Sequence, residues 1–269
     1  IIGAYWLLIM CSQTLSAVRD PQGFRPLCIG KLDKDIVFSS ESCALDIMGA
    51  EFERDVKPGE VIVVTNNEMK SYDCKNGQND GLCIFEYIYF ARPDSTIDGI
   101  NVHRFREEVG KYLAMQAPVE ADFVAGVPDS GLDSALGYSK QSKIPYDMAF
   151  IKSKYIGRTF IQSTQTKRKS QVVLKLNPIK TTVAGKRIVL VDDSIVRGTT
   201  ITRLIKILRR AGAKEIHLRI ASPKFVGICY FGTDVAKKDE LIAVGKTTEE
   251  ICKEIGADSL EYLSLENLR

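Results

Sequence analysis

The first 70 residues carry short apolar or β-branched runs separated by polar turns, a pattern that predicts a β-rich region. The predicted strands are residues 3–10, 14–20, 24–32, 35–40 and 59–65. One helix fits the segment SESCALDIMG, with Ser40 or Ser42 expected as its N-cap and Gly49 as its end. The polar stretch 66–81, rich in Gly and Asn, then predicts a boundary between two domains, residues 1–75 and 76–269.

From residue 82 onward, strand-like and helix-like segments alternate. The predicted strands are residues 83–90, 145–153, 187–191 and 215–223, and residues 122–131 read as a strand that runs into a Gly-containing loop. The predicted helices are residues 102–117, 134–142, 199–213, 239–243 and 247–257, the last capped by Thr247 or Thr248. This alternation predicts an α/β fold in which helices cover both faces of a parallel sheet. Such sheets bind ligands at the carboxyl ends of their strands.

The segment RIVLVDDSIVRGTT, residues 187–200, puts Asp192 and Asp193 at the carboxyl end of a predicted buried strand. Two adjacent carboxylates repel each other unless a cation or a hydroxyl-rich ligand lies between them. Carboxylates suit the vicinal hydroxyls of a sugar and Mg²⁺. Gly198 lets the backbone approach a ligand closely, and the start of the next helix can hold a phosphate. The segment therefore predicts a sugar-phosphate site, whereas plain helix capping by Asp193 and the threonines explains less of it.

Composition narrows the class of protein. The chain has 269 residues, 45% hydrophobic and 26% charged, which is typical of a soluble globular protein. A formal net charge of +3 is too small to indicate a nucleic-acid partner. No apolar run reaches the roughly 18 residues of a membrane span. The apolar opening IIGAYWLLIM lacks the marks of a signal peptide and reads as a strand cut at its start, so we expect a fragment.

Cysteine usage and charge distribution add two expectations. The seven cysteines include no CxxC pair and no small disulfide framework, which predicts a reduced, cytoplasmic chain. Between Asp147 and Asp192 there is no acidic residue, but there are ten Lys or Arg. Charge alone leaves open whether this stretch is a solvated face or a ligand-binding segment.

The segment VLVDDSIVRGTT resembles the signature of the type I phosphoribosyltransferases, which bind 5-phosphoribosyl-1-pyrophosphate (PRPP). The segments SAVRDPQGFRPLCIGKL, FEYIYFARPDS, GVPDSG and KYIGRTFIQ resemble the amidophosphoribosyltransferase family in order and spacing. The resemblance runs from about residue 2 to residue 269. It implies a type I phosphoribosyltransferase sheet preceded by the β-rich later part of an N-terminal-nucleophile glutaminase domain.

The resemblance implies a reaction and its site residues. Ammonia released from glutamine displaces pyrophosphate from PRPP, giving 5-phosphoribosylamine in the first committed step of purine synthesis. The residues that match the family's PRPP segment are Asp192, Asp193, Ser194, Ile195, Val196, Arg197, Gly198, Thr199 and Thr200. The residues that match its Mg²⁺ ligands are Ser130, Asp192 and Asp193. We expect catalysis by positioning and charge neutralisation, without a covalent intermediate.

The acid-free stretch matches a family loop, residues 152–171, that closes over PRPP. The residues expected to face phosphate or to line the ammonia route are Lys152, Lys154, Tyr155 and Arg158. The glutaminase nucleophile of the family is an amino-terminal cysteine. This chain begins with Ile1, so glutaminase chemistry is expected of the family and not of these residues.

Some family members hold a 4Fe-4S cluster through four cysteines. Cys83 and Cys229 match two of them, and two thiolates alone cannot hold such a cluster in the usual way. The cluster is therefore an expectation for an intact protein.

The resemblance also implies purine nucleotides as feedback inhibitors and a homo-oligomer, usually a tetramer. A regulatory PRPP- or nucleotide-binding module of the same fold is the alternative to an enzyme. The motif KYIGRTF and residues 1–70 favour the enzyme, and the absence of a Gly-rich first turn speaks against a hydride-transferring dinucleotide enzyme.

Overall fold

The computed structural model describes residues 2–66, 68–74, 81–153, 176–233, 235 and 237–268. It divides into two compact units, Ile1–Phe105 with Cys229–Asp234, and Arg106–Ile228 with Val235–Arg269. The domain boundary expected between residues 75 and 76 falls at the edge of the segment 75–80, which lies outside the described residues, and it stays a prediction. None of the helices in the described ranges is long and apolar enough to cross a bilayer.

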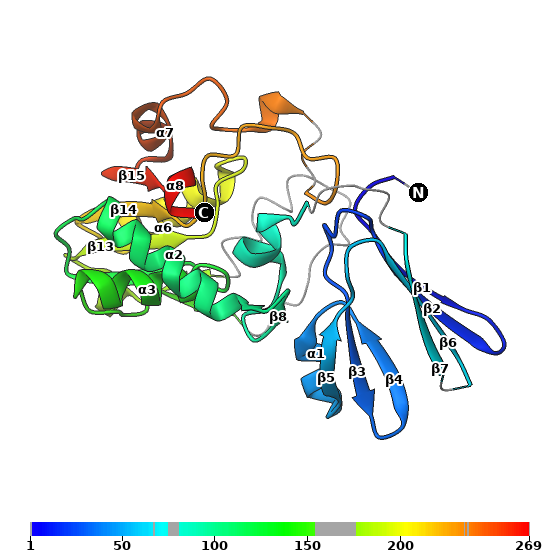
Figure 1. Ribbon diagram of the computed structural model, residues 1–269. Coiled ribbons are helices and arrows are strands. Elements are labelled where there is room, and N and C mark those ends of the chain that lie inside the picture. The colour runs from blue at the N-terminus through cyan, green and yellow to red at the C-terminus, as the bar shows by residue number, and fades with distance from the viewer. Residues whose placement is uncertain are drawn as a thin grey trace. The chain divides into compact units, whose positions relative to one another are not determined.

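The first unit contains two larger antiparallel sheets (Figure 1). One has the order β1-β2-β6-β7, with bounds Trp6–Met10, Thr14–Arg19, Glu60–Thr65 and Glu68–Asp73. The other has the order β4-β3-β5, with bounds Asp35–Ser39, Cys28–Leu32 and Glu51–Asp55. The smaller elements are α1 (Ser42–Met48), the π-helical turn η1 (Glu86–Phe90), β8 (Thr96–Ile97) and β9 (Ile100–Asn101). Strands of both sheets contribute to one apolar core, which includes Ala17, Ile29 and Ile62.

Two local expectations for this unit were wrong, and strand β7 was not expected. Helix α1 is capped by Glu41, not by Ser40 or Ser42, although it ends at Gly49 as expected. Residues 86–90 form the π-helical turn η1 instead of a strand. Tyr87 and Ile88 are buried in this turn as they would be in a strand, so the apolar pattern did not distinguish the two. Strand β7 lies within the polar stretch 66–81, where backbone pairing with β6 and not an apolar pattern defines it.

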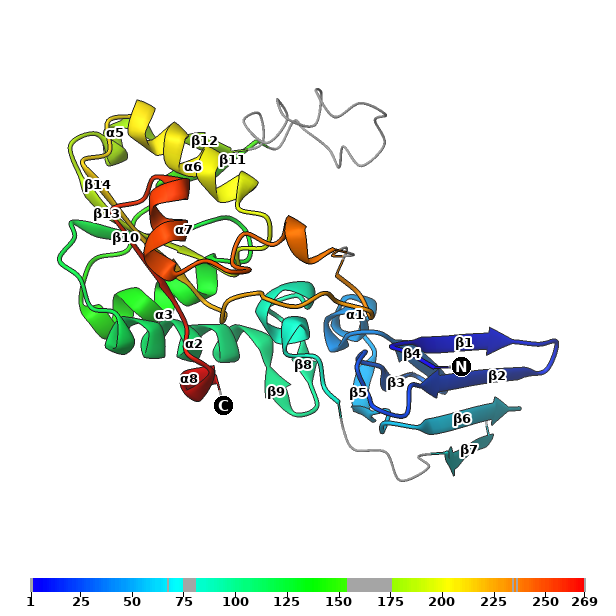
Figure 2. The same cartoon turned by 90° about the horizontal axis from the view of Figure 1, so that it is seen from above.

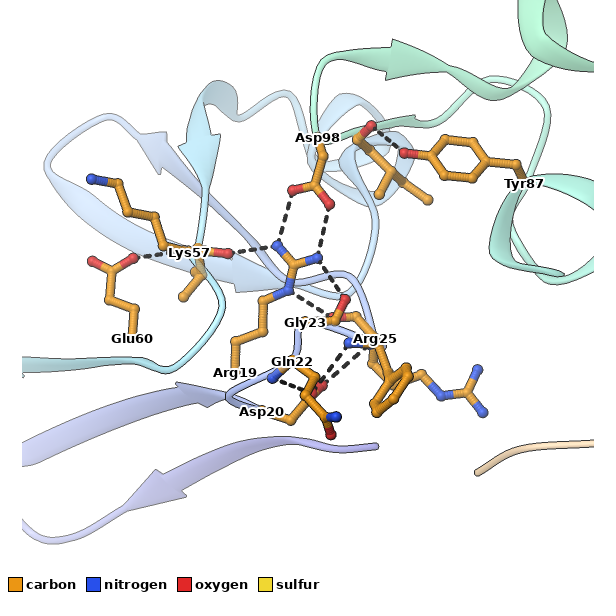
Figure 3. Close-up of polar contacts among 12 residues, drawn as sticks. Arg19, Asp20, Gln22, Gly23, Arg25, Lys57, Glu60, Tyr87 and Asp98 are labelled. Atoms are coloured by element: carbon orange, nitrogen blue, oxygen red, sulfur yellow. Dashed lines mark hydrogen bonds and ion pairs between the residues drawn. The ribbon is translucent and has the colours of Figure 1, made fainter. Parts of the chain in front are cut away.

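A buried polar network fixes the loop after β2 (Figure 3). The Asp20 carboxylate accepts hydrogen bonds from the backbone N–H groups of Gln22, Phe24 and Arg25 at 3.1, 3.2 and 3.3 Å. The Arg19 guanidinium, 1% exposed, donates to both carboxylate oxygens of Asp98 at 3.0 and 2.9 Å. The turn DPQG, residues 20–23, is thus held by hydrogen bonds.

The second unit is built on a parallel sheet of order β10-β13-β14-β15. These strands span Phe123–Gly126, Arg187–Asp192, Glu215–Ile220 and Ser259–Tyr262. Figure 2 shows α2 and α3 on one face of the sheet and α6 and α7 on the other. These helices span Val102–Gln116, Leu132–Ser142, Thr199–Arg210 and Thr248–Ile255. The expected α/β fold with helices on both faces is confirmed.

Short elements complete the second unit. They are β11 (Phe150–Lys152), β12 (Leu176–Pro178), α5 (Lys180–Val183), the 3₁₀ turn η2 (Lys238–Glu240) and α8 (Leu265–Leu268). The helix expected over residues 239–243 is only this 3₁₀ turn, since the chain becomes extended at Leu241. Helix α7 has the expected cap, a capping box formed by Thr247 and Glu250. The core on one face of the sheet joins apolar residues of β10, β13 and β14 to those of α6 and α7.

Candidate functional site

The acidic pair lies where β13 ends. Asp192 is the last residue of this central strand, and Asp193 follows it. The two residues are only 8% and 7% exposed, and the Asp193 N–H donates to Asp192 Oδ1 at 3.0 Å. Burial, together with the charge of Asp193, raises the pKa of Asp192 well above its ordinary value. Two adjacent buried carboxylates repel each other, and a bound divalent cation would offset this repulsion.

Ser130 reaches the pair from the loop between β10 and α3. Its hydroxyl donates a hydrogen bond to Asp193 Oδ2. Burial raises the pKa of Asp193, while hydrogen bonds from Ser130 and Ser194 and the charge of Arg106 act in the opposite direction. The structure thus joins residues that stand 63 positions apart in the sequence.

The oxygen ligands of this cluster fit Mg²⁺, which binds through one or two carboxylates and completes its shell with water and substrate oxygens. In the described ranges no group of three or more His, Cys, Asp and Glu side chains could hold a metal ion. A cation at the acidic pair would therefore use Ser130 or substrate oxygens in addition to the two aspartates.

The turn after the pair leads into the N-terminus of α6. Gly198 is the N-cap, with φ 73°, and it has no side chain that could accept a hydrogen bond from the first turn of the helix. The Ser194 hydroxyl donates to Asp193 Oδ1 at 2.5 Å, and Thr199 and Thr200 are exposed. Unpaired N–H groups, exposed hydroxyls and the positive end of the helix dipole form an arrangement that suits an anion.

Lys152, at the end of β11, forms an ion pair with Asp129, the neighbour of Ser130. Its side chain is therefore close to the β10–α3 loop, as a residue that faces pyrophosphate would be. The other residues expected in the closing loop, Lys154, Tyr155 and Arg158, lie outside the described residues.

Sequence reasoning missed two charged residues near this site. Arg106 on α2 is 3% exposed, and its charge lowers the pKa of Asp193 against the effect of burial. Glu240 in η2 binds the Arg197 side chain. Neither residue belongs to a motif. The one signal in the sequence is the place of Arg106 on the apolar face of a predicted amphipathic helix.

Cys83 and Cys229 fall in the same compact unit. The Cys229 sulfur accepts hydrogen bonds from the N–H groups of Phe231 and Thr233, each at 3.4 Å. Burial raises the pKa of Cys229, but hydrogen bonds from Thr233 and the nearby N–H groups outweigh it and lower the pKa to about 7. Burial raises the pKa of Cys83, and the charge of Cys229 adds to this effect. A thiolate held in this way fits a soft metal, while two cysteines supply half of a four-cysteine site.

Arg25 connects the two cysteine-bearing segments. It forms an ion pair with Glu86 at 2.5 Å and donates to the Phe231 carbonyl at 3.1 Å. The rings of Phe24 and Phe231 are stacked with their centroids 4.7 Å apart. Arg25 and Phe24 thus hold together the segments that carry Cys83 and Cys229.

Comparison with known proteins agrees with this architecture. Residues 108–224 match the phosphoribosyl transferase domain family, which defines the class of the second unit. The chain is 52% identical to the amidophosphoribosyltransferase of Methanocaldococcus jannaschii, over 100% of this chain and 60% of the relative. It is 48% identical to that of Bacillus subtilis, over 99% of this chain and 56% of the relative.

One solved structure is similar to almost the whole of this chain. The glutamine PRPP amidotransferase from B. subtilis, complexed with ADP and GMP, is 48% identical and superposes with a TM-score of 0.91. The match covers 99% of this chain and 58% of that one. The chain therefore belongs to the amidophosphoribosyltransferase family, and it spans 56–60% of the length of these two relatives.

Proposed function

We propose that this chain carries the phosphoribosyl-transfer site of an amidophosphoribosyltransferase, which makes 5-phosphoribosylamine from PRPP at the start of purine synthesis. The observation that carries the proposal is the buried Asp192–Asp193 pair, bonded to Ser130 and followed by the open N-terminus of α6. Family membership supports an enzyme over a regulatory module.

Each part of the site has a role in this reaction. Thr199, Thr200 and the N–H groups of the first turn of α6 bind the 5-phosphate, and the two aspartates orient the ribose hydroxyls. Mg²⁺, held by Ser130, Asp192 and Asp193 together with substrate oxygens, would neutralise the charge of the leaving pyrophosphate. The nitrogen of ammonia forms a bond to C1 of the ribose, the bond from C1 to the pyrophosphate oxygen breaks, and the nitrogen loses a proton to solvent.

Several further parts of the proposal come from the family. Lys152, with Lys154, Tyr155 and Arg158, would belong to a loop that covers PRPP and excludes water. Residues 1–75 would be part of a glutaminase domain that supplies ammonia. Cys83 and Cys229 would be two of four ligands of a 4Fe-4S cluster, and the N–H donors around Cys229 support this role.

We also propose a cytoplasmic homo-oligomer, a tetramer, under feedback control by purine nucleotides. The nucleotide control is supported by the similar B. subtilis structure, which is complexed with ADP and GMP.

The test is release of pyrophosphate from PRPP and Mg²⁺ by the purified chain, with ammonium and glutamine as separate nitrogen donors. We expect ammonium-dependent release, because ammonium bypasses the glutaminase reaction. Asp193→Asn should lower it at least 100-fold, a loss of about 3 kcal/mol of transition-state stabilisation. The control is Asp147→Asn, which removes an equal charge outside the site and should leave release unchanged. A folded chain that neither binds PRPP nor releases pyrophosphate would contradict the proposal.

A further inference from the structure

The loop Ser194–Gly198 is contacted by a segment outside the PRPP motif, Glu240–Ile242, which we call the clasp. Glu240 accepts two hydrogen bonds through Oε2 from Arg197, at 2.9 Å from Nε and 2.6 Å from Nη2. The Ile242 N–H donates to the Val196 carbonyl at 3.0 Å. Hydrogen bonds therefore join two adjacent residues of the loop, Val196 and Arg197, to the clasp.

Packing adds a third contact. Ile242 and Ile195 are 7% and 4% exposed and belong to the same core. A Cβ added to Gly198 would overlap Cδ1 of Ile242, so the clasp lies directly against the N-cap of α6. The positive φ of Gly198 and the absence of this Cβ together allow the approach.

The contacts lie on one side of the loop and leave Thr199 and Thr200 exposed. A loop of this kind has no ladder of backbone hydrogen bonds to order it, and a ligand that had to order it would bind more weakly. The clasp orders the backbone from Val196 to Gly198 before any ligand arrives. The phosphate-binding N–H groups then need little rearrangement.

We propose that the clasp pre-organises the phosphate-binding loop and that Glu240 is its positioning residue. Glu240 contacts Arg197 and does not contact the substrate in this proposal, so its effect on binding is exerted through the loop. This proposal rests on the proposed function, since it assumes that the loop binds the 5-phosphate of PRPP.

The size of the effect follows from exposure. The Arg197 and Glu240 side chains are 44% and 37% exposed, and water screens an ion pair of this kind. We expect loss of Glu240 to weaken phosphate binding about three- to fivefold, which corresponds to roughly 0.7–1 kcal/mol. The backbone bond and the packing of Ile242 remain in such a variant.

The experiment compares wild type, Glu240→Ala, Glu240→Gln and the matched control Asp239→Asn, which removes a charge one residue away. Titration calorimetry measures binding of ribose 5-phosphate without metal and of PRPP with Mg²⁺. We expect three- to fivefold weaker binding of both ligands to Glu240→Ala and an intermediate loss for Glu240→Gln, which keeps an acceptor oxygen. Asp239→Asn should bind as wild type does.

Kinetics separates positioning from general damage. In ammonium-dependent pyrophosphate release, Glu240→Ala should raise KM for PRPP and leave kcat unchanged, with an unchanged melting temperature. Equal binding by Glu240→Ala and Asp239→Asn, or tighter binding by Glu240→Ala, would overturn the clasp while the proposed function stands. A folded wild-type chain that binds neither ligand would instead overturn the proposed function and the clasp with it.

Discussion

At the scale of single residues, the first unit contains a buried positive charge, the guanidinium of Arg19. Arg19 donates to Asp98 and to the carbonyls of Gly23, Arg25 and Val56. All its donor nitrogens are therefore bonded, which makes burial of the guanidinium tolerable. Asp55 lies near this ion pair as an additional negative charge.

Asp55 gives a pH dependence. Burial first, and then the charge of Asp98, raises the pKa of Asp55 from 3.8 to about 6. Between about pH 4 and 6 the folded chain binds more protons than the unfolded chain, so the contribution to stability is lost as the pH rises through this window. We expect Asp55→Asn to reduce this fall in the free energy of unfolding, measured by urea titration from pH 4 to 7. The exposed control, Asp35→Asn, should keep it, and an equal fall in both variants would contradict the assignment.

At the scale of elements, α2 and α3 pack through glycines. A Cβ on Gly110 would overlap the Ser134 carbonyl, and a Cβ on Gly137 would overlap the Glu107 carbonyl. The backbones of the two helices are therefore in direct contact. The Tyr138 hydroxyl also donates to the Ala117 carbonyl at 2.9 Å. This packing fixes the helix that follows the Ser130 loop.

The contact reverses the usual effect of a helical glycine. Gly→Ala in an exposed helix interior stabilises by up to about 1 kcal/mol, because alanine favours the helix. Gly137→Ala should instead destabilise the second unit by about 1–3 kcal/mol, because the new methyl group forces α2 and α3 apart. Chemical denaturation followed by far-UV circular dichroism measures this. Gly227→Ala, where a Cβ meets open space, is the control, and a stabilised Gly137→Ala variant would show that the helices are not in contact.

At the scale of the whole molecule, the chain has two units that each possess a core. The first is β-rich, and the long helices with the parallel sheet belong to the second. Chains divided in this way often unfold in more than one step. The single tryptophan, Trp6, lies in β1 and reports on the first unit alone.

Two substitutions should therefore shift two different transitions. Arg19→Met removes the hydrogen bonds that the buried guanidinium donates to the carbonyls of Gly23 and Val56, and it should destabilise the first unit by about 1–3 kcal/mol. Its effect should appear in Trp6 fluorescence during urea unfolding, whereas Gly137→Ala should shift the helical circular dichroism signal. If either substitution moves both signals together, the two units unfold as one cooperative structure.

Much of the fold could be predicted from the sequence. Periodicity found β10, β13, β14, α2, α3 and α6, since buried strands and amphipathic helices leave different apolar spacing. Strand β7 was missed because its residues are mostly polar and exposed, so pairing with β6 defines it. The turn η1 was misread because a short apolar run does not distinguish a buried strand from a buried helical turn.

The sequence by itself determined the acidic pair, the glycine turn and the start of α6, because these lie within fourteen consecutive residues whose local chemistry is complete. Only the tertiary structure decided which distant residues support them. Arg106 and Glu240 reach the site from other elements, whereas Ser130 was already expected from the family resemblance. Their roles depend on distances across the fold and on the low dielectric of a buried position, and neither quantity is encoded in a local pattern.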